Sequence, residues 1–126
     1  MNSEIYRETI LEHYANPVNA GDIPDADATA RDFNPSCGDV VEIQAKFSDG
    51  IVKDIKFRGE GCAISQSSVD ILLGIVKNKT IAEVENFTTE DFLEILGIEL
   101  SPLRLKCALL GLNTLKTAVH TYLTRV

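Results

Sequence analysis

Hydrophobic and polar residues alternate cleanly between residues 39 and 47. The hydrophobic side of this segment consists of Val41, Ile43, Ala45 and Phe47. Side chains of a β-strand point to opposite faces in turn, so the pattern predicts a half-buried strand. A strong turn signal follows at Asp49-Gly50. The returning segment has its hydrophobic face at Ile51, Ile55 and Phe57. We therefore expect an antiparallel hairpin over residues 39–57.

The chain before the hairpin predicts one helix and a long loop. Residues 3–14 read as a short helix, whose narrow apolar stripe is formed by Ile5, Ile10 and Tyr14. This helix ends before Asn16-Pro17, because the residue before a proline avoids the α conformation. Residues 15–35 are rich in Pro, Gly, Asp and Ala, which is typical of a loop. We expect at most a short edge strand near residues 28–33.

Beyond Cys62 the hydrophobic period becomes helical. A first helix ends near Lys79, and its apolar positions are Ile64, Ile71, Leu72, Ile75 and Val76. Residues 80–83 have the Thr-x-x-Glu form of a capping box and open a short second helix. Thr88 or Thr89 caps a third helix, which Gly97 ends. Ser101-Pro102 opens a long last helix. The apolar stripe of that helix is formed by Leu105, Leu109, Leu112, Val119 and Leu123.

The predicted order is a helix, a sheet and then helices alone. This order is typical of a two-layer α+β domain. A chain of 126 residues is one domain by length. We therefore expect a single domain over residues 1–126, with a small antiparallel sheet of about three strands packed against several helices and a long C-terminal helix.

The composition excludes several classes of partner. The 12 Lys and Arg residues against 19 Asp and Glu give a net charge of −7, so we expect no nucleic-acid binding. No apolar run approaches the roughly 20 residues that span a bilayer, so we expect no membrane association. The first residues lack the basic and apolar regions of a signal peptide. We expect a cytoplasmic protein whose three cysteines stay reduced, as thiols or as metal ligands.

The three cysteines lie near predicted element ends, where side chains from distant parts of the sequence converge. Cys37 precedes the first hairpin strand, Cys62 follows the sheet, and Cys107 lies in the second turn of the last helix. Asp39 points to the same side as Cys37 if that stretch is extended. Three thiolates and one carboxylate suit tetrahedral Zn²⁺ or an iron–sulfur cluster. The alternative is that the cysteines are small buried hydrophobic residues, since their separations match no compact ligand spacing.

Glycines stand next to two of these cysteines. Gly38, Gly59 and Gly61 would give a bulky inorganic group room against the backbone, because glycine lets other atoms approach closely. Alternatively, these glycines mark a bulge or a tight turn.

Separate segments of the chain resemble one known family in the right order. "NPSCGD" (34–39), "GEGCAIS" (59–65) and "SPLRLKCALL" (101–110) are similar to the three ligand loops of the iron–sulfur cluster assembly scaffolds of the IscU, NifU N-terminal and SufU family. "ILEHYANPVNAG" (10–21) is similar to the family's N-terminal helix and following loop. The likeness covers nearly the whole chain, and it implies a SufE/NifU-like fold with a small antiparallel sheet covered by helices.

The resemblance implies a scaffold rather than an enzyme that turns over. Such a protein accepts sulfur from a cysteine desulfurase of the IscS, SufS or NifS kind, assembles a transient [2Fe–2S] cluster and passes it to recipient Fe–S apoproteins. Cys37, Cys62 and Cys107 match the family's ligand cysteines, and Asp39 matches its aspartate. The resemblance also implies that Zn²⁺ binds in the same pocket. Cys107 and Cys37 are the candidate persulfide acceptors, and the free protein would be a monomer or a weak homo-oligomer.

The chain departs from both branches of the family. Lys106 stands where the IscU branch carries a histidine, as expected for the SufU branch, but the insertion typical of SufU proteins is missing. Residues 100–104 differ from the proline-rich motif that a dedicated chaperone reads in IscU proteins. The sequence is therefore a hybrid of the two patterns.

Lys106 and Arg104 are basic residues close to Cys107. Their positive charges would favour a thiolate, with a smaller contribution from the start of the helix. The alternative is that both are solvated surface charges. Together with Gly38 and Gly61, they are the residues expected just outside the ligand set.

The two histidines are not expected to be ligands. A helix places His120 about 220° around from Cys107, so it faces roughly away. His13 belongs to the N-terminal helix and reaches the pocket only if that helix folds over it. We expect both histidines at the surface.

Three functions stay open from the sequence. The first is the cluster scaffold, and the second is a SufU-type zinc-dependent sulfur acceptor that activates the desulfurase, which would be sulfurtransferase-like. The third is an interaction module whose zinc only stabilises the fold. The N-terminal helix and its loop match the family's desulfurase contacts at Tyr6, Ile10 and residues 16–21, unless they pack on their own core.

Overall fold

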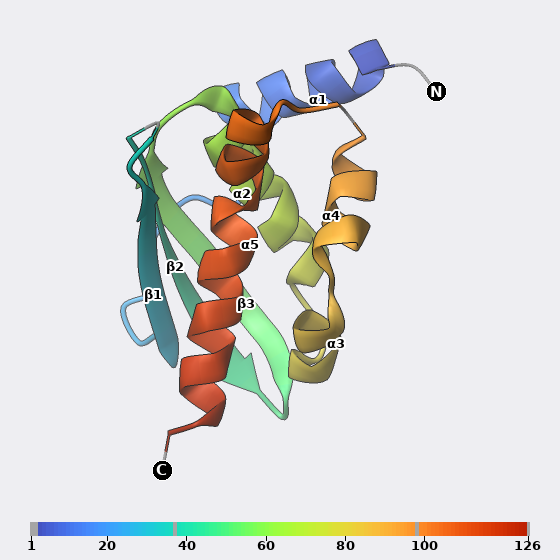
Figure 1. Ribbon diagram of the computed structural model, residues 1–126. Helices are drawn as coiled ribbons and strands as arrows, with labels where there is room; N and C mark the ends of the chain where they lie inside the picture. The colour runs from blue at the N-terminus through green and yellow to red at the C-terminus, as the bar shows by residue number, and fades with distance from the viewer. Residues whose placement is uncertain (1–2, 37, 98, 126) are drawn as a thin grey trace.

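The protein, described as a computed structural model over residues 3–36, 38–97 and 99–125, forms a sheet with helices packed on it (Figure 1). In chain order the elements are α1 (Ser3–Ala15), β1 (Ala28–Asn34), β2 (Asp39–Ser48), β3 (Ile51–Glu60), α2 (Ala63–Val76), α3 (Ile81–Asn86), α4 (Thr89–Leu96) and α5 (Pro102–Leu123). The predicted α+β class, with a three-stranded antiparallel sheet and a long C-terminal helix, is confirmed.

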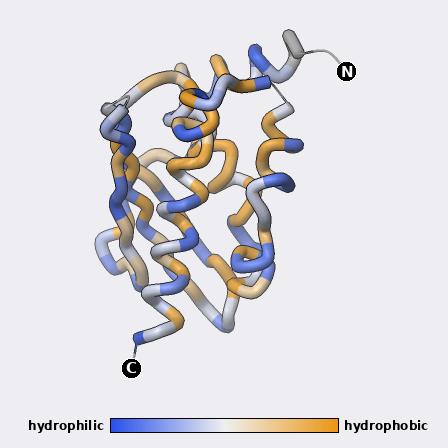
Figure 2. The backbone as a smooth tube through the Cα atoms, in the orientation of Figure 1, coloured by the Kyte–Doolittle hydropathy of each residue, from blue (hydrophilic) through white to orange (hydrophobic). Residues whose placement is uncertain are grey.

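The sheet has the order β1-β2-β3, so β2 is central and β1 is the expected edge strand. Alternate residues of β2 face the helices, and hydrophobic and hydrophilic positions alternate along the strands in Figure 2. The four hydrophobic residues predicted for this face are buried, and they are Val41, Ile43, Ala45 and Phe47. The turn between β2 and β3 has positive φ at Asp49 (54°) and Gly50 (75°), as a tight hairpin requires.

The prediction for the start of β3 is wrong because the strand contains a bulge. Lys46 pairs with Asp54, but Phe47 pairs with Val52, so Lys53 is an extra residue on β3. One inserted residue exchanges the two faces of a strand. Val52 is therefore buried, whereas the predicted Ile51 is 36% exposed.

The short helices begin and end where their capping signals predict. Thr80 and Thr88 each form a capping box, and Gly97 ends α4 in a left-handed conformation. The Thr80 N–H donates to the Glu83 carboxylate and holds the pKa of that carboxyl below its ordinary value. These local hydrogen bonds satisfy backbone groups that a helix end leaves without partners.

Helix α2 ends three residues earlier than predicted, at Val76 instead of Lys79. Asn78 adopts a positive φ of 70°, and its N–H donates to the Val52 carbonyl. The Lys79 carbonyl in turn accepts from the Val52 N–H. The chain leaves the helix here because it pairs with the edge of β3.

The buried face of helix α5 is wider than the single apolar stripe predicted from the sequence, because the helix packs against β1, β2 and α2. Leu112 and Val119 are buried as predicted, but Leu105 and Leu109 are half-buried and Leu123 is exposed. The other buried residues are Cys107, Ala108, Leu110, Gly111, Thr114, Leu115 and Ala118. Gly111 permits this close packing because it has no Cβ. An added Cβ would lie 2.9 Å from Val69. No helix in the described part of the chain is long and apolar enough to cross a membrane.

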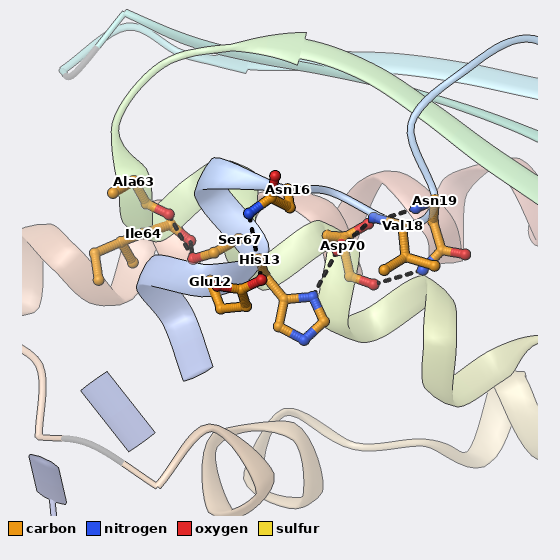
Figure 3. A network of polar contacts seen from close by, with 9 residues as sticks. All are labelled: Glu12, His13, Asn16, Val18, Asn19, Ala63, Ile64, Ser67 and Asp70. Atoms are coloured by element: carbon orange, nitrogen blue, oxygen red, sulfur yellow. Dashed lines mark hydrogen bonds and ion pairs between the residues drawn. The ribbon is translucent and has the colours of Figure 1, made fainter. Parts of the chain in front are cut away.

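Helix α1 is fastened to α2 by a buried carboxylate (Figure 3). Asp70 has no exposed surface, and its Oδ2 lies 2.6 Å from His13 Nδ1. The carboxylate also accepts from the Val18 N–H at 3.1 Å and the Asn19 N–H at 2.7 Å. The expectation of a plain surface histidine at position 13 is therefore wrong, whereas His120 is exposed as expected.

We expect Asp70→Ala to lower the free energy of unfolding by about 1–3 kcal/mol, because it leaves the buried Asn19 N–H and the partly buried Val18 N–H without an acceptor. Urea unfolding followed by circular dichroism measures this change. Glu94→Ala, at an exposed position on α4, is the control and should stay within about 0.5 kcal/mol of the unmodified protein. Equal stability of the two variants would show that the carboxylate does not fasten α1.

Candidate metal centre

Three elements bring Asp39, Cys62 and Cys107 together. Asp39 begins β2, Cys62 precedes α2, and Cys107 lies in the second turn of α5. One ligand atom from each residue lies within 4.8 Å of the other two. The fourth predicted ligand, Cys37, lies outside the described residues, so its position stays a prediction.

Asp39 presents its two carboxylate oxygens to different groups. The residue has no exposed surface. Its Oδ1 accepts a hydrogen bond from the Cys62 N–H at 2.8 Å, and its Oδ2 lies 3.9 Å from Cys62 Sγ. One oxygen is therefore anchored to the backbone, while the other faces the sulfur.

Cys62 is the N-cap residue of α2. Its Sγ accepts a hydrogen bond from the Ser65 N–H at 3.5 Å, in the place where a Ser or Asp oxygen commonly caps a helix. The positive end of the helix dipole favours negative charge on this sulfur. The side chain is half-buried, so solvent reaches it.

Cys107 is the most deeply buried of the described cysteines. It has no exposed surface, and Asn34 Nδ2 lies 3.8 Å from its sulfur. Asn34 is not among the site residues that the sequence predicts. The available signal was an asparagine before a proline, which is typical of a turn in which the side chain hydrogen-bonds to nearby backbone.

The glycines before Cys62 make room for Asp39 and α2. A Cβ at Gly61 would lie 2.2 Å from Asp39 Oδ1, and Gly61 has a φ of 145°. A Cβ at Gly59 would lie 2.3 Å from the Val40 carbonyl oxygen and 2.7 Å from Gln66 Oε1. The expectation that these two glycines make room for an inorganic group is therefore corrected, because the protein's own atoms occupy that space.

Gly38 differs from the other two glycines. It has a φ of 71°, and no atom would lie within 4 Å of an added Cβ. The chain is thus not extended at Gly38, which removes the reason for expecting Cys37 and Asp39 on the same side.

The basic residues near Cys107 are at the surface. Lys106 and Arg104 are both exposed on the first turns of α5. Their proposed effect on the Cys107 sulfur stays a prediction.

The exposed surface of the N-terminal helix differs from the desulfurase-contact surface predicted at Tyr6, Ile10 and residues 16–21. Ile10 is only 4% exposed and packs inside, so it cannot form part of a free partner surface. Tyr6 is half-buried, and its ring fills the space beside Gly97. The exposed hydrophobic residues of this region are Leu11, Tyr14 and Val18.

The donor set fits a soft or borderline metal. Two sulfurs and a carboxylate oxygen converge at the ends of separate elements, and thiolates bind Zn²⁺ and iron–sulfur centres tightly. A carboxylate oxygen is a harder and weaker ligand for such metals. The fold and the site together define a small α+β domain in which sulfur and oxygen donors converge in a way that could hold a metal ion.

Comparison with known proteins identifies the family. The family model described as NifU-like N terminal domain matches residues 5–126. The chain belongs to this family, and the resemblance seen in its sequence is confirmed.

Relatives and solved structures are similar over most of the chain. The iron–sulfur cluster assembly scaffold protein IscU of Aquifex aeolicus is 34% identical over 122 residues, which are 95% of this chain and 77% of that protein. IscU of Escherichia coli K12 is 32% identical, covering 93% of each. A SufU structure from Fervidobacterium islandicum, named as a scaffold protein for the SUF system, has a TM-score of 0.78 at 29% identity and covers 94% of this chain and 99% of that one.

We expect Gly61→Ala to weaken metal binding as well as stability. The added Cβ displaces Asp39 Oδ1 and breaks its hydrogen bond to Cys62, and the positive φ costs about 1–3 kcal/mol. Urea unfolding of the apoprotein and Zn²⁺ titration measure the two effects. Gly50→Ala is the control, because it also has a positive φ (75°) but open space around its Cβ. Zinc affinity equal in the two variants would contradict the steric role of Gly61.

Proposed function

We propose that this protein is an iron–sulfur cluster assembly scaffold. It accepts sulfur from a cysteine desulfurase, holds a nascent [2Fe–2S] cluster on Cys37, Asp39, Cys62 and Cys107, and passes the cluster to recipient apoproteins. The observation that carries this proposal is the convergence of Asp39, Cys62 and Cys107 within 4.8 Å from three separate elements. Relatives that are named as IscU scaffolds, and are matched over 77% and 93% of their own length, support it.

The ligand set suits cargo that must be held and then released. Thiolates bind iron firmly, and the carboxylate of Asp39 supplies the weaker bond. Since Asp39 Oδ1 is anchored to the Cys62 N–H, only Oδ2 is directed toward the sulfur. A recipient thiolate can replace a single oxygen contact without displacing the rest of the site.

Sulfur acceptance requires a thiolate of this protein to attack the terminal sulfur of the desulfurase persulfide. The S–S bond of the donor breaks, the desulfurase cysteine leaves as a thiolate, and a new S–S bond forms on the acceptor. Cys37 and Cys107 are the proposed acceptors. Cys107 has no exposed surface, so the groups that cover it must move before a persulfide can reach it.

A second function is a SufU-type zinc-dependent sulfur acceptor. Two observations favour it. Lys106 stands where the IscU branch carries a histidine and is exposed, and the chain is similar to a SufU structure. In this alternative Zn²⁺ occupies the same ligands, and one cysteine leaves it to take the persulfide.

Anaerobic reconstitution with ferrous iron, cysteine, a desulfurase and a thiol reductant, which reduces the transferred sulfur to sulfide, distinguishes the two functions. We expect the absorption spectrum of a [2Fe–2S] centre, which Cys62→Ser should abolish because it removes a thiolate at the heart of the site. Tight zinc without cluster formation, together with stimulated desulfurase turnover, would establish the acceptor instead. Absence of both responses would overturn both proposals and leave a zinc-stabilised interaction module.

We expect Asp39→Ala to make the bound cluster longer-lived, because the ligand that exchanges most easily is gone. Transfer to an apo-ferredoxin should slow about tenfold, equivalent to about 1.4 kcal/mol in the barrier. Asp32→Ala, at an exposed position on β1, is the control. Transfer rates equal in all three proteins would refute the exchange role of Asp39.

A further inference from the structure

Asn34 lies against the most deeply buried sulfur of the site. It is only 7% exposed at the end of β1, and its Nδ2 donates a hydrogen bond to Cys107 Sγ at 3.8 Å. The contact joins residues 73 positions apart in the sequence, so it ties the end of β1 to α5. A hydrogen bond shielded from water is stronger electrostatically than an exposed one.

The backbone around Asn34 sets the direction of its amide group. Asn34 Oδ1 accepts a hydrogen bond from the Ser36 N–H at 3.2 Å, and the Asn34 carbonyl accepts one from the Gly38 N–H at 2.9 Å. Because the side-chain oxygen faces a backbone donor, the NH₂ end must face Cys107. The turn therefore directs a donor, and not an acceptor, at the sulfur.

A hydrogen-bond donor at this position offsets buried negative charge on the metal ligands. A divalent cation held by three thiolates and a carboxylate leaves the centre with net negative charge. Buried charge is costly unless hydrogen-bond donors surround it. The Cys62 sulfur already accepts from the Ser65 N–H, and Cys107 accepts from Asn34.

We propose that Asn34 is a positioning residue that directs the Cys107 sulfur into the metal centre and stabilises its negative charge through the N–H···S hydrogen bond. This inference rests on the proposed function, because it concerns the same ligand set. Asn34 acts through Cys107 and is not itself a ligand.

Two substitutions separate this role from a purely structural one. Asn34→Ser keeps a side-chain oxygen that can accept from the Ser36 N–H, but the side chain is shorter than that of asparagine, so its hydroxyl does not reach the sulfur, which already lies 3.8 Å from Asn34 Nδ2. Asn34→Ala removes both hydrogen bonds. Asn113→Ser is the matched control, because Asn113 is exposed on the same helix as Cys107.

The test is an anaerobic Co²⁺ titration of the apo forms of the unmodified protein and the three variants. We expect the sulfur-to-cobalt absorption band of Asn34→Ser and Asn34→Ala to move to longer wavelength, because a sulfur without its donor gives up electron density more easily. Cobalt affinity should fall on the order of 10- to 100-fold in both, as it does when groups that orient metal ligands are removed. Asn113→Ser should match the unmodified protein, and thermal unfolding should show Asn34→Ala as the least stable apo form.

The possible outcomes separate this proposal from the function on which it rests. An unmodified protein without a sulfur-to-cobalt band overturns the proposed site, and the role of Asn34 with it. A normal band in the unmodified protein, together with the same band and affinity in Asn34→Ser, overturns the positioning role alone, because the residue then only makes a turn. If Asn34→Ala does not fold, the serine variant decides the question.

Discussion

The hydrogen bond from the Cys62 N–H to Asp39 Oδ1 is the contact on which the site depends. It fastens the N-terminus of α2 to the first residue of β2. The carboxylate of Asp39 lies directly against the backbone of Gly61, which has no Cβ. A side chain at position 61 would occupy the space of the carboxylate. The same contact therefore fixes where Cys62 stands relative to the sheet and which oxygen of Asp39 faces its sulfur.

The end of the domain that carries this contact is polar inside, unlike the rest of the core. Asp39, Asn34 and Asp70 are all buried. Asp39 and Asp70 accept hydrogen bonds from backbone N–H groups of distant segments, whereas Asn34 bonds the Ser36 N–H of its own turn and the Cys107 sulfur. Such networks are worthwhile only when every member is satisfied, because an unpaired buried polar group is costly. Packing alone would favour apolar residues here. Their polarity is understandable if this end exists to hold charged cargo, since functional sites are where a sequence departs from the simplest folding rules.

The arrangement also supports the proposal that this small domain binds a metal through ligands of different strength. Each described ligand is carried by the end of a different element and is supported by its own neighbour: Cys62 by Ser65, Cys107 by Asn34 and Asp39 by Cys62. Supported ligands keep their geometry when no metal is bound. In the proposed scaffold, the hard oxygen of Asp39 among soft sulfurs is the ligand that would exchange first. Membership of the NifU-like family, whose relatives include IscU scaffolds, agrees with this chemistry.

The sequence by itself determined the main elements, the class of fold and the three residues that the structure brings together, Asp39, Cys62 and Cys107. Alternation in β2, the capping boxes at Thr80 and Thr88 and the turn at Asp49-Gly50 are local signals, so they can be read along the chain. Only the tertiary structure decided what lies at longer range: the bulge that turns Val52 inward, the buried pairing of His13 with Asp70, and the donor that Asn34 directs at Cys107. These features depend on pairing between segments that are distant in sequence, and side-chain patterns within one segment carry no information about such partners.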